Sequence, residues 1–315
     1  MPPALRLSSL RLLAVYGAVM AAVAFLLASD GSTARADASA VAARGARVAA
    51  ERSDIYVVSV DGTHLTKLTH ARDDTFFGWP AWAPSGTKIA FSGPPCEDCP
   101  DALYVARLGG MGARRLKTGV VPAAHPKWSP DGRRIAFVGG SEGAVYVFDL
   151  RTGTSQRLTR DHAAHDAPAW SPDGKQIAFS RQQRNGGWDL WLMNRDGTRE
   201  LRLTRTKTSE LHSAWSPNGE ELAFARQRRD RWAIYAMGLS RRSAGRLMPG
   251  RASREMPTWS PDGSEIAFAQ LGTRSAIYLM SAGGTRLRSL ATISDSYSPA
   301  WSPDGLTIAF VGAGS

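Results

Sequence analysis

The sequence is poor in cysteine, and this scarcity already limits its class. Of 315 residues only Cys96 and Cys99 are cysteines, too few for the dense disulfide framework of small secreted domains. Hydrophobic residues make up 43% of the chain, so its core is expected to suffice without such a framework. We predict that the two cysteines form a local disulfide that tightens their own loop, with free thiols as the alternative.

Motifs for several functions are also missing. The sequence has no Gly-x-Ser-x-Gly nucleophile elbow with a hydrolase domain behind it. It has no basic run with interleaved aromatic residues, so we predict no specific nucleic-acid site. We expect no cofactor and no bound metal. The formal net charge of +11 favours acidic partners in general, but the arginines are spread along the chain, which indicates ordinary surface charge.

Long apolar runs are absent except for one near the N-terminus. Leu12 to Ala28 carry no charge, follow Arg6 and Arg11, and precede small residues that fit a cleavage site. This order is typical of a secretory signal, although the run is also at the lower limit for a membrane anchor. We predict a signal peptide or N-terminal anchor over residues 1–38, a linker over 39–52, and an exported protein in either case: periplasmic, cell-surface or secreted.

A repeat fills the rest of the chain, residues 53–315. Its first half has the pattern Trp-Ser-Pro-Asp-Gly-x-x-Ile-Ala-Phe, and the tryptophans of successive copies lie 42–46 residues apart. The six copies begin at Trp82, Trp128, Trp170, Trp215, Trp259 and Trp301. Ser-Pro-Asp-Gly suits a tight turn, and Ile-Ala-Phe suits a strand buried on both faces. Periods of this length with several strands per unit predict propeller blades.

A second half-unit alternates with the first and also occurs six times. It contains an apolar strand such as Asp54-Ile-Tyr-Val, a turn, and a strand that ends near Leu-Thr. The chain starts with this second half, at residues 54–69, and ends with a first half, at 299–311. We therefore predict an all-β, six-bladed propeller with four-stranded blades, whose sixth blade pairs the N-terminal strands with the C-terminal ones and so leaves no exposed edge.

The repeated unit resembles that of TolB-type six-bladed propellers. The resemblance rests on Trp-Ser-Pro-Asp-Gly-x-x-Ile-Ala-Phe followed by Ile-Tyr-x-Met and Leu-Thr, and it covers residues 54–311. It implies the propeller fold and a binding or scaffolding role at the cell envelope. TolB itself has an additional α/β domain before its propeller, where this sequence has only the short linker.

Candidate binding residues follow from the positions that vary between the copies. In a propeller, the connection into each innermost strand lies near the mouth of the central channel, and here it precedes each repeat tryptophan. If the ring closes, side chains from several blades should meet at this mouth, where they could hold a ligand or act as acid and base. The candidates are Trp79, His125, Asp166, His212, Arg254, Glu255 and Tyr297.

Two other groups of charged residues are weighed against ordinary structural roles. Arginines between the second and third strands of neighbouring blades could form a cationic patch, although a solvated loop explains them more simply. These are Arg181, Arg184, Arg226, Arg228, Arg229 and Arg231. The aspartates of the Ser-Pro-Asp-Gly turns lie in separate blades, too far apart to share a calcium ion, and are attributed to turn chemistry.

Two functional hypotheses remain open at this stage. The first is an exported binding or scaffolding propeller, a monomer with a protein or small ligand as partner, an acidic one among the candidates. The second is an enzyme with its site in the channel, a lyase or hydrolase that acts on a saccharide or peptide. Only the polar residues expected at the channel mouth support the second hypothesis.

Overall fold

The computed structural model describes residues 52–313, except 71–74, 97, 111, 273–274, 291–292 and 294. The predicted signal or anchor and all of the predicted linker except Arg52 lie outside the described residues, so those two assignments stay predictions. In the part of the chain that is described, no helix is long and apolar enough to cross a membrane.

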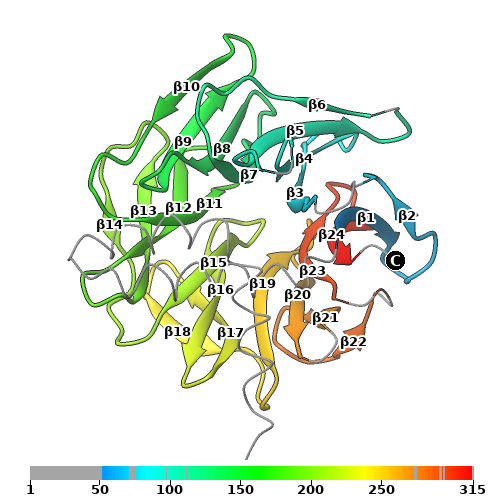
Figure 1. Ribbon diagram of the computed structural model, residues 1–315. Coiled ribbons are helices and arrows are strands. Elements are labelled where there is room, and N and C mark those ends of the chain that lie inside the picture. Colours follow the sequence, from blue (N-terminus) through cyan, green and yellow to red (C-terminus); the bar gives the residue numbers. More distant parts are fainter. Residues whose placement is uncertain are drawn as a thin grey trace, which may run out of the picture.

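Twenty-four strands form six antiparallel sheets of four in the described residues, arranged as blades around a central axis (Figure 1). Blades 1 to 5 are contiguous in sequence: β3–β6, β7–β10, β11–β14, β15–β18 and β19–β22. The innermost strands of blades 1 to 6 are β3 (Gly78–Trp82), β7 (Ala123–Trp128), β11 (His165–Trp170), β15 (Glu210–Trp215), β19 (Ser253–Trp259) and β23 (Tyr297–Trp301).

The other three strands of each blade follow outward in the same blade order. The second strands are β4 (Lys88–Gly93), β8 (Arg134–Gly139), β12 (Gln176–Gln182), β16 (Glu221–Arg228), β20 (Glu265–Leu271) and β24 (Thr307–Ala313). The third strands are β5 (Ala102–Arg107), β9 (Ala144–Asp149), β13 (Trp188–Asn194), β17 (Arg231–Gly238), β21 (Ala276–Ser281) and β1 (Ser53–Ser59). The outer strands are β6 (Ala113–Arg115), β10 (Thr154–Arg157), β14 (Leu201–Arg202), β18 (Ser243–Arg246), β22 (Arg288–Ser289) and β2 (Thr66–Lys67).

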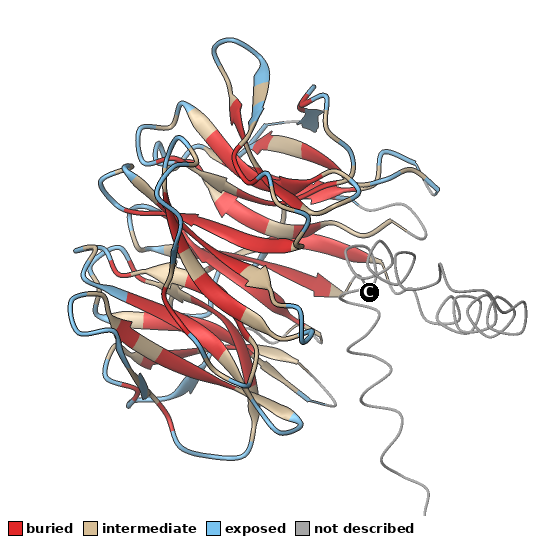
Figure 2. Ribbon diagram, turned by 90° about the vertical axis from the view of Figure 1, so that its left-hand side faces the viewer, coloured by how far each residue is buried: buried red, intermediate tan, exposed pale blue. Residues whose placement is uncertain are grey.

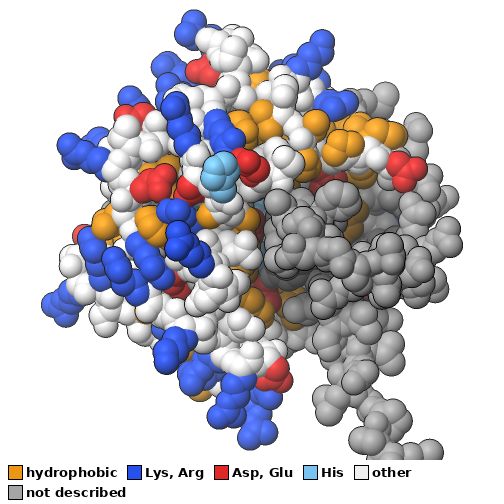
Figure 3. Space-filling view, turned by 60° about the vertical axis from the view of Figure 1, so that its left-hand side comes forward, with side chains coloured by type: hydrophobic (Ala, Val, Ile, Leu, Met, Phe, Trp, Pro, Cys, Tyr) orange, Lys and Arg blue, Asp and Glu red, His pale blue; other side chains and the backbone are white. Residues whose placement is uncertain are grey.

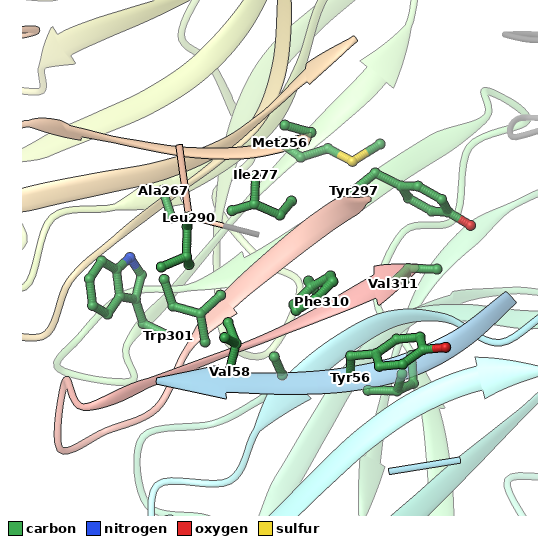
Figure 4. Close-up of a cluster of buried hydrophobic side chains, with 14 of the residues drawn as sticks. Tyr56, Val58, Met256, Ala267, Ile277, Leu290, Tyr297, Trp301, Phe310 and Val311 are labelled. Carbon is green, nitrogen blue, oxygen red and sulfur yellow. The ribbon is translucent and has the colours of Figure 1, made fainter. Parts of the chain in front are cut away.

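The two ends of the repeat region share blade 6, and this confirms the predicted closure. Its strand order is β2-β1-β24-β23, with β1 antiparallel to β24 over seven residue pairs, from Ser53 opposite Ala313 to Ser59 opposite Thr307. Tyr56 lies directly opposite Phe310, and their rings stack with centroids 5.8 Å apart (Figure 4). The first and last strands are thus joined by a full ladder and a packed core.

The core repeats the large-small-large pattern of the second strands. The phenylalanine that ends each Ile-Ala-Phe motif is fully buried in every blade: Phe91, Phe137, Phe179, Phe224, Phe268 and Phe310. The central alanine is fully buried as well, because each blade packs on both faces and a small side chain lets its neighbour approach. Buried segments accordingly run through the middle of the strands, whereas exposed residues gather in the connecting loops (Figure 2).

Two of the repeat tryptophans bond to the preceding blade, and the turns of the repeat have the role predicted for them. Trp82 donates its indole N–H to the carbonyl of Ala300 in the preceding blade at 3.1 Å, and Trp215 does the same to Ala169 at 3.0 Å. In the turns, Asp131 accepts hydrogen bonds from the hydroxyl of Ser129 and the backbone N–H of Arg133. These bonds hold the pKa of Asp131 below its ordinary value, as expected for turn chemistry.

Candidate functional site

Each innermost strand contains a β-bulge at the same place, and the bulge sets the geometry of the site. The ladder shifts register there, and one non-glycine residue has a positive φ between 46° and 57°. These residues are Trp79, His125, Ala167, His212, Met256 and Ser298. A left-handed conformation is unfavourable for such side chains, but its recurrence in all six blades makes it a property of the fold. Bulges redirect side chains, and here they do so beside the axis.

Six of the seven predicted residues, together with Phe76, form one continuous series of contacts around the axis. We call this series the mouth belt: Phe76, Trp79, His125, Asp166, His212, Glu255 and Tyr297. Its members come from all six blades. The belt divides into an aromatic half, supplied by blades 6 and 1, and an ionisable half, supplied by blades 2 to 5.

Aromatic rings make up the first half of the mouth belt. Tyr297 stacks on Phe76 with ring centroids 6.1 Å apart, and Phe76 meets Trp79 edge-on at 6.3 Å. The ring centroids of Trp79 and the His125 imidazole lie 4.2 Å apart. Burial raises the pKa of the Tyr297 hydroxyl, so this residue is a neutral phenol at physiological pH. This half offers flat apolar surface for stacking.

Histidines and carboxylates make up the second half. His125 contacts the carboxylate of Asp166 through Nδ1, Nε2 of His212 lies 4.0 Å from the same carboxylate, and Nδ1 of His212 lies 3.9 Å from Glu255. His125, Asp166, His212 and Glu255 are each less than 9% exposed. The buried Nε2 of His125 has no hydrogen-bond partner among the described residues. A buried donor or acceptor of this kind usually meets a water or a ligand.

Burial and neighbouring charges set the ionisation of this half. Desolvation lowers the pKa of His212 to about 4, although the nearby Asp166 opposes the shift. Burial alone would raise the pKa of Asp166, but His125 and His212 outweigh it and the pKa lies below its ordinary value. At neutral pH the belt therefore holds an ionised Asp166 between His125 and a neutral His212.

Arg254 is the one predicted residue that the structure does not bring into the belt. Its guanidinium donates to the carbonyl of Pro249 at 3.1 Å and to the side chain of Gln270 at 3.2 Å. Successive residues of a strand point to opposite faces, so Glu255 reaches the belt and Arg254 points away from it. The prediction took both neighbours and overlooked this alternation.

Next to the belt, the loop between β4 and β5 contains the two cysteines, which form a disulfide in the structure. Closing so short a loop stabilises the fold by at most about 2 kcal/mol, so its effect is local.

Asp101 follows the loop, and its carbonyl accepts a hydrogen bond at 2.9 Å from the backbone N–H of Ala123, where β7 begins. Burial raises the pKa of the Asp101 carboxyl to about 6, against the opposing effect of His125.

The arginine-rich loops of blades 3 and 4 are only partly available as a cationic patch. Arg181 pairs with Asp161 at 2.5 Å and packs on Trp191, and Arg226 pairs with the buried Glu210 at 2.9 Å. Elsewhere Lys and Arg side chains spread over much of the described face in Figure 3. This distribution is that of a generally basic surface.

A surface cavity of about 730 Å³ lies away from the belt, between blades 4 and 5. Turn residues such as Pro217 and Gly263 line it together with Trp259. None of the belt residues lines it. Its ionisable lining residues are Glu221 and Asp262, and Asp262 is held by hydrogen bonds within its own turn, so we do not regard the cavity as the site.

Six four-stranded blades with a closing blade of mixed origin define the chain as a β-propeller. More particularly, it belongs to the TolB β-propeller domain family, whose sequence pattern matches residues 95–311. A 59-residue stretch is 42% identical to the Tol-Pal system protein TolB of Coxiella burnetii, and this stretch covers 18% of the chain and 14% of that relative.

Solved structures share the architecture at lower identity. The structure of a putative TolB from Agrobacterium tumefaciens aligns with a TM-score of 0.74 and 22% identity, over 84% of this chain and 99% of that one. An oligogalacturonate lyase in complex with manganese aligns with a TM-score of 0.54 and 14% identity, over 83% of this chain and 96% of that one. At these identities the likenesses show the fold alone.

Proposed function

We propose that the protein is an exported binding module that holds a ligand or a segment of a partner protein at the mouth belt. The observation that carries the proposal is the belt itself, in which side chains from six blades meet at the axis. Stacking surface on one side and hydrogen-bonding groups on the other are what a small recognition site requires. The relationship to a Tol-Pal system protein agrees with a protein partner at the envelope.

Comparing what the full chain and its variants bind tests this proposal. Immobilised wild-type protein, Trp79→Ala and Glu255→Gln are incubated with a soluble extract of the producing cell's envelope, and bound molecules are quantified by mass spectrometry. Arg133→Ala is the matched control, because Arg133 is exposed in the turn at the other end of its inner strand. Molecules retained by wild type and Arg133→Ala should be retained about tenfold less by the belt variants, since each variant removes a side-chain group of the belt.

Thermal unfolding of every variant accompanies the binding comparison, so that loss of fold is not mistaken for loss of binding. If folded belt variants retain the same molecules as wild type in the same amounts, the belt is not the binding site and the proposal fails. If Arg133→Ala alone loses them, the opposite face binds instead.

Export is the second part of the proposal, and it rests on residues 1–38. Their basic start, apolar middle and small-residue end support translocation. We expect N-terminal sequencing of the protein recovered outside the cytoplasm to begin just after Ala36 or Ala38. A full-length chain recovered with the membrane fraction would favour the anchor, and a full-length chain in the cytoplasm would contradict export.

An enzyme that works at the belt is the second candidate function. The observation that favours it is the contact between His125 and the buried carboxylate of Asp166, an arrangement that orients an imidazole for proton transfer. The oligogalacturonate lyase and the puromycin hydrolase structures show that related folds belong to enzymes. In this case His125→Gln should abolish a turnover that wild type shows, whereas a binding module shows no turnover to lose.

A further inference from the structure

One position of the repeat departs from the others in a way that the belt does not explain. The residue directly before each repeat tryptophan is small in five blades: Ala81, Ala169, Ala214, Thr258 and Ala300. In blade 2 this position is Lys127. Blade 2 thus has a long cationic side chain beside the axis where the other five blades have a small residue.

Lys127 lies on β7, two residues beyond His125 and opposite Ala136. It is half-buried, with the remainder accessible. β7 is the innermost strand of blade 2, so Lys127 lies beside the axis. Lys127 also acts electrostatically on His212 of blade 4 and helps to lower its pKa, which agrees with a position near the belt.

No carboxylate of the described residues forms an ion pair or hydrogen bond with Lys127. Other cationic side chains do form such pairs, for example Lys67 with Asp54. Desolvation lowers its pKa to about 8. The group is therefore still mainly protonated at neutral pH. Taking an unpaired charge out of water is unfavourable. An anion bound to the Lys127 ammonium group would offset this unfavourable free energy.

We propose that Lys127 forms the inner end of the ligand site and binds a carboxylate group, while the body of the ligand lies against the mouth belt. This inference rests on the proposed function and names the chemistry of its ligand. A carboxylate suits a single ammonium group, since one negative charge is balanced in full. A phosphate dianion would carry one charge more than the ammonium group can balance.

The four small residues and Thr258 at the equivalent positions support this arrangement. Their side chains are short, so they take up little space around the axis. Alanine is the residue that most other blades use here, so Lys127→Ala restores the pattern of the repeat. It should fold with no loss of thermal stability, which makes it a clean test variant.

The test observes Lys127 directly in the full chain. The sequence contains only six lysines, so protein labelled with [ε-¹³C]lysine gives a simple spectrum, in which the signal missing from Lys127→Ala is that of Lys127. The probes are sodium butyrate, uncharged butyramide, inorganic phosphate and sodium chloride, each up to about 100 mM at constant ionic strength. We expect butyrate alone to shift the Lys127 signal saturably and to raise its pKa by about one unit, because an ion pair favours the protonated amine.

Each other result counts against the inference. An unshifted Lys127 signal, or equal shifts with butyrate and chloride, would overturn it, and stronger binding of phosphate would overturn the choice of carboxylate. The binding comparison of the previous section separates the two proposals. There Lys127→Ala should bind the captured ligand about tenfold more weakly than wild type. Full retention by Lys127→Ala with loss in Trp79→Ala would leave the belt as the site and refute the role of Lys127.

Discussion

Replacing Phe310 by alanine is expected to lower the free energy of unfolding by about 4 kcal/mol. Phe310 is fully buried, and its partner Tyr56 comes from the other end of the repeat region. Truncating a buried phenylalanine usually costs about 3–5 kcal/mol, because transfer energy is lost and a cavity remains. Denaturant unfolding monitored by tryptophan fluorescence measures the change.

Two control variants show whether the loss of stability comes from the buried core of blade 6. Leu306→Ala changes a residue of the same blade that is 64% exposed, and it should shift the free energy by less than about 0.5 kcal/mol. Phe137→Ala changes the equivalent phenylalanine of blade 2 and should cost about as much as Phe310→Ala. A loss below about 1 kcal/mol for Phe310→Ala, with the full loss for Phe137→Ala, would mean that blade 6 is not closed as described.

Acid is expected to destabilise the fold through His212, and His212→Gln should remove that part of the acid sensitivity. The folded-state pKa of His212 is about 4, against an ordinary value of 6.5. Between these values the unfolded chain binds a proton that the folded chain does not, so stability falls as the pH drops below 6.5. From pH 7 to pH 5 the loss from this one residue is about 2 kcal/mol.

Comparison of two variants isolates this contribution from other groups. His165, whose pKa burial also lowers to about 4, acts in the same direction, whereas Asp101, raised to about 6, acts in the opposite one. The free energy of unfolding of His212→Gln minus that of wild type should rise by about 2 kcal/mol between pH 7 and pH 5. His165→Gln is the second variant and should also show a rise, because burial lowers the pKa of His165 to about 4 as well. A constant difference for His212→Gln would show that His212 ionises normally in the fold.

The fold could be predicted from the sequence because every blade packs its core with the same residue types at equivalent positions. Phe137 and Phe310 occupy equivalent positions far apart in the chain, and both are fully buried. The closure could also be predicted, because the half-unit at 54–69 and the half-unit at 299–311 are different halves of the repeat. Together they make one complete blade. Strand pairing in the structure follows this order.

Less of the candidate site could be predicted, for reasons of local geometry. Variation among the copies pointed to the segments whose side chains meet at the axis. The bulge within each segment was not evident, because the residues with positive φ are Trp, His, Ala, Met and Ser instead of Gly. The alternation of side chains along β19 was also overlooked, so Arg254, which lies outside the belt, was included with Glu255. Lys127 was missed although the signal was present, since a lysine replaces the alanine or threonine that precedes the tryptophan in every other copy.

The central claim is that the mouth belt is where the protein meets its ligand. Photo-cross-linking tests it most directly, with benzoylphenylalanine placed at Trp79 in one protein and at Arg133, on the opposite face, in another. We predict that envelope extract gives a specific cross-linked product with the probe at position 79 and none with the probe at 133. A product at 133 and none at 79, with both proteins folded, would contradict the account.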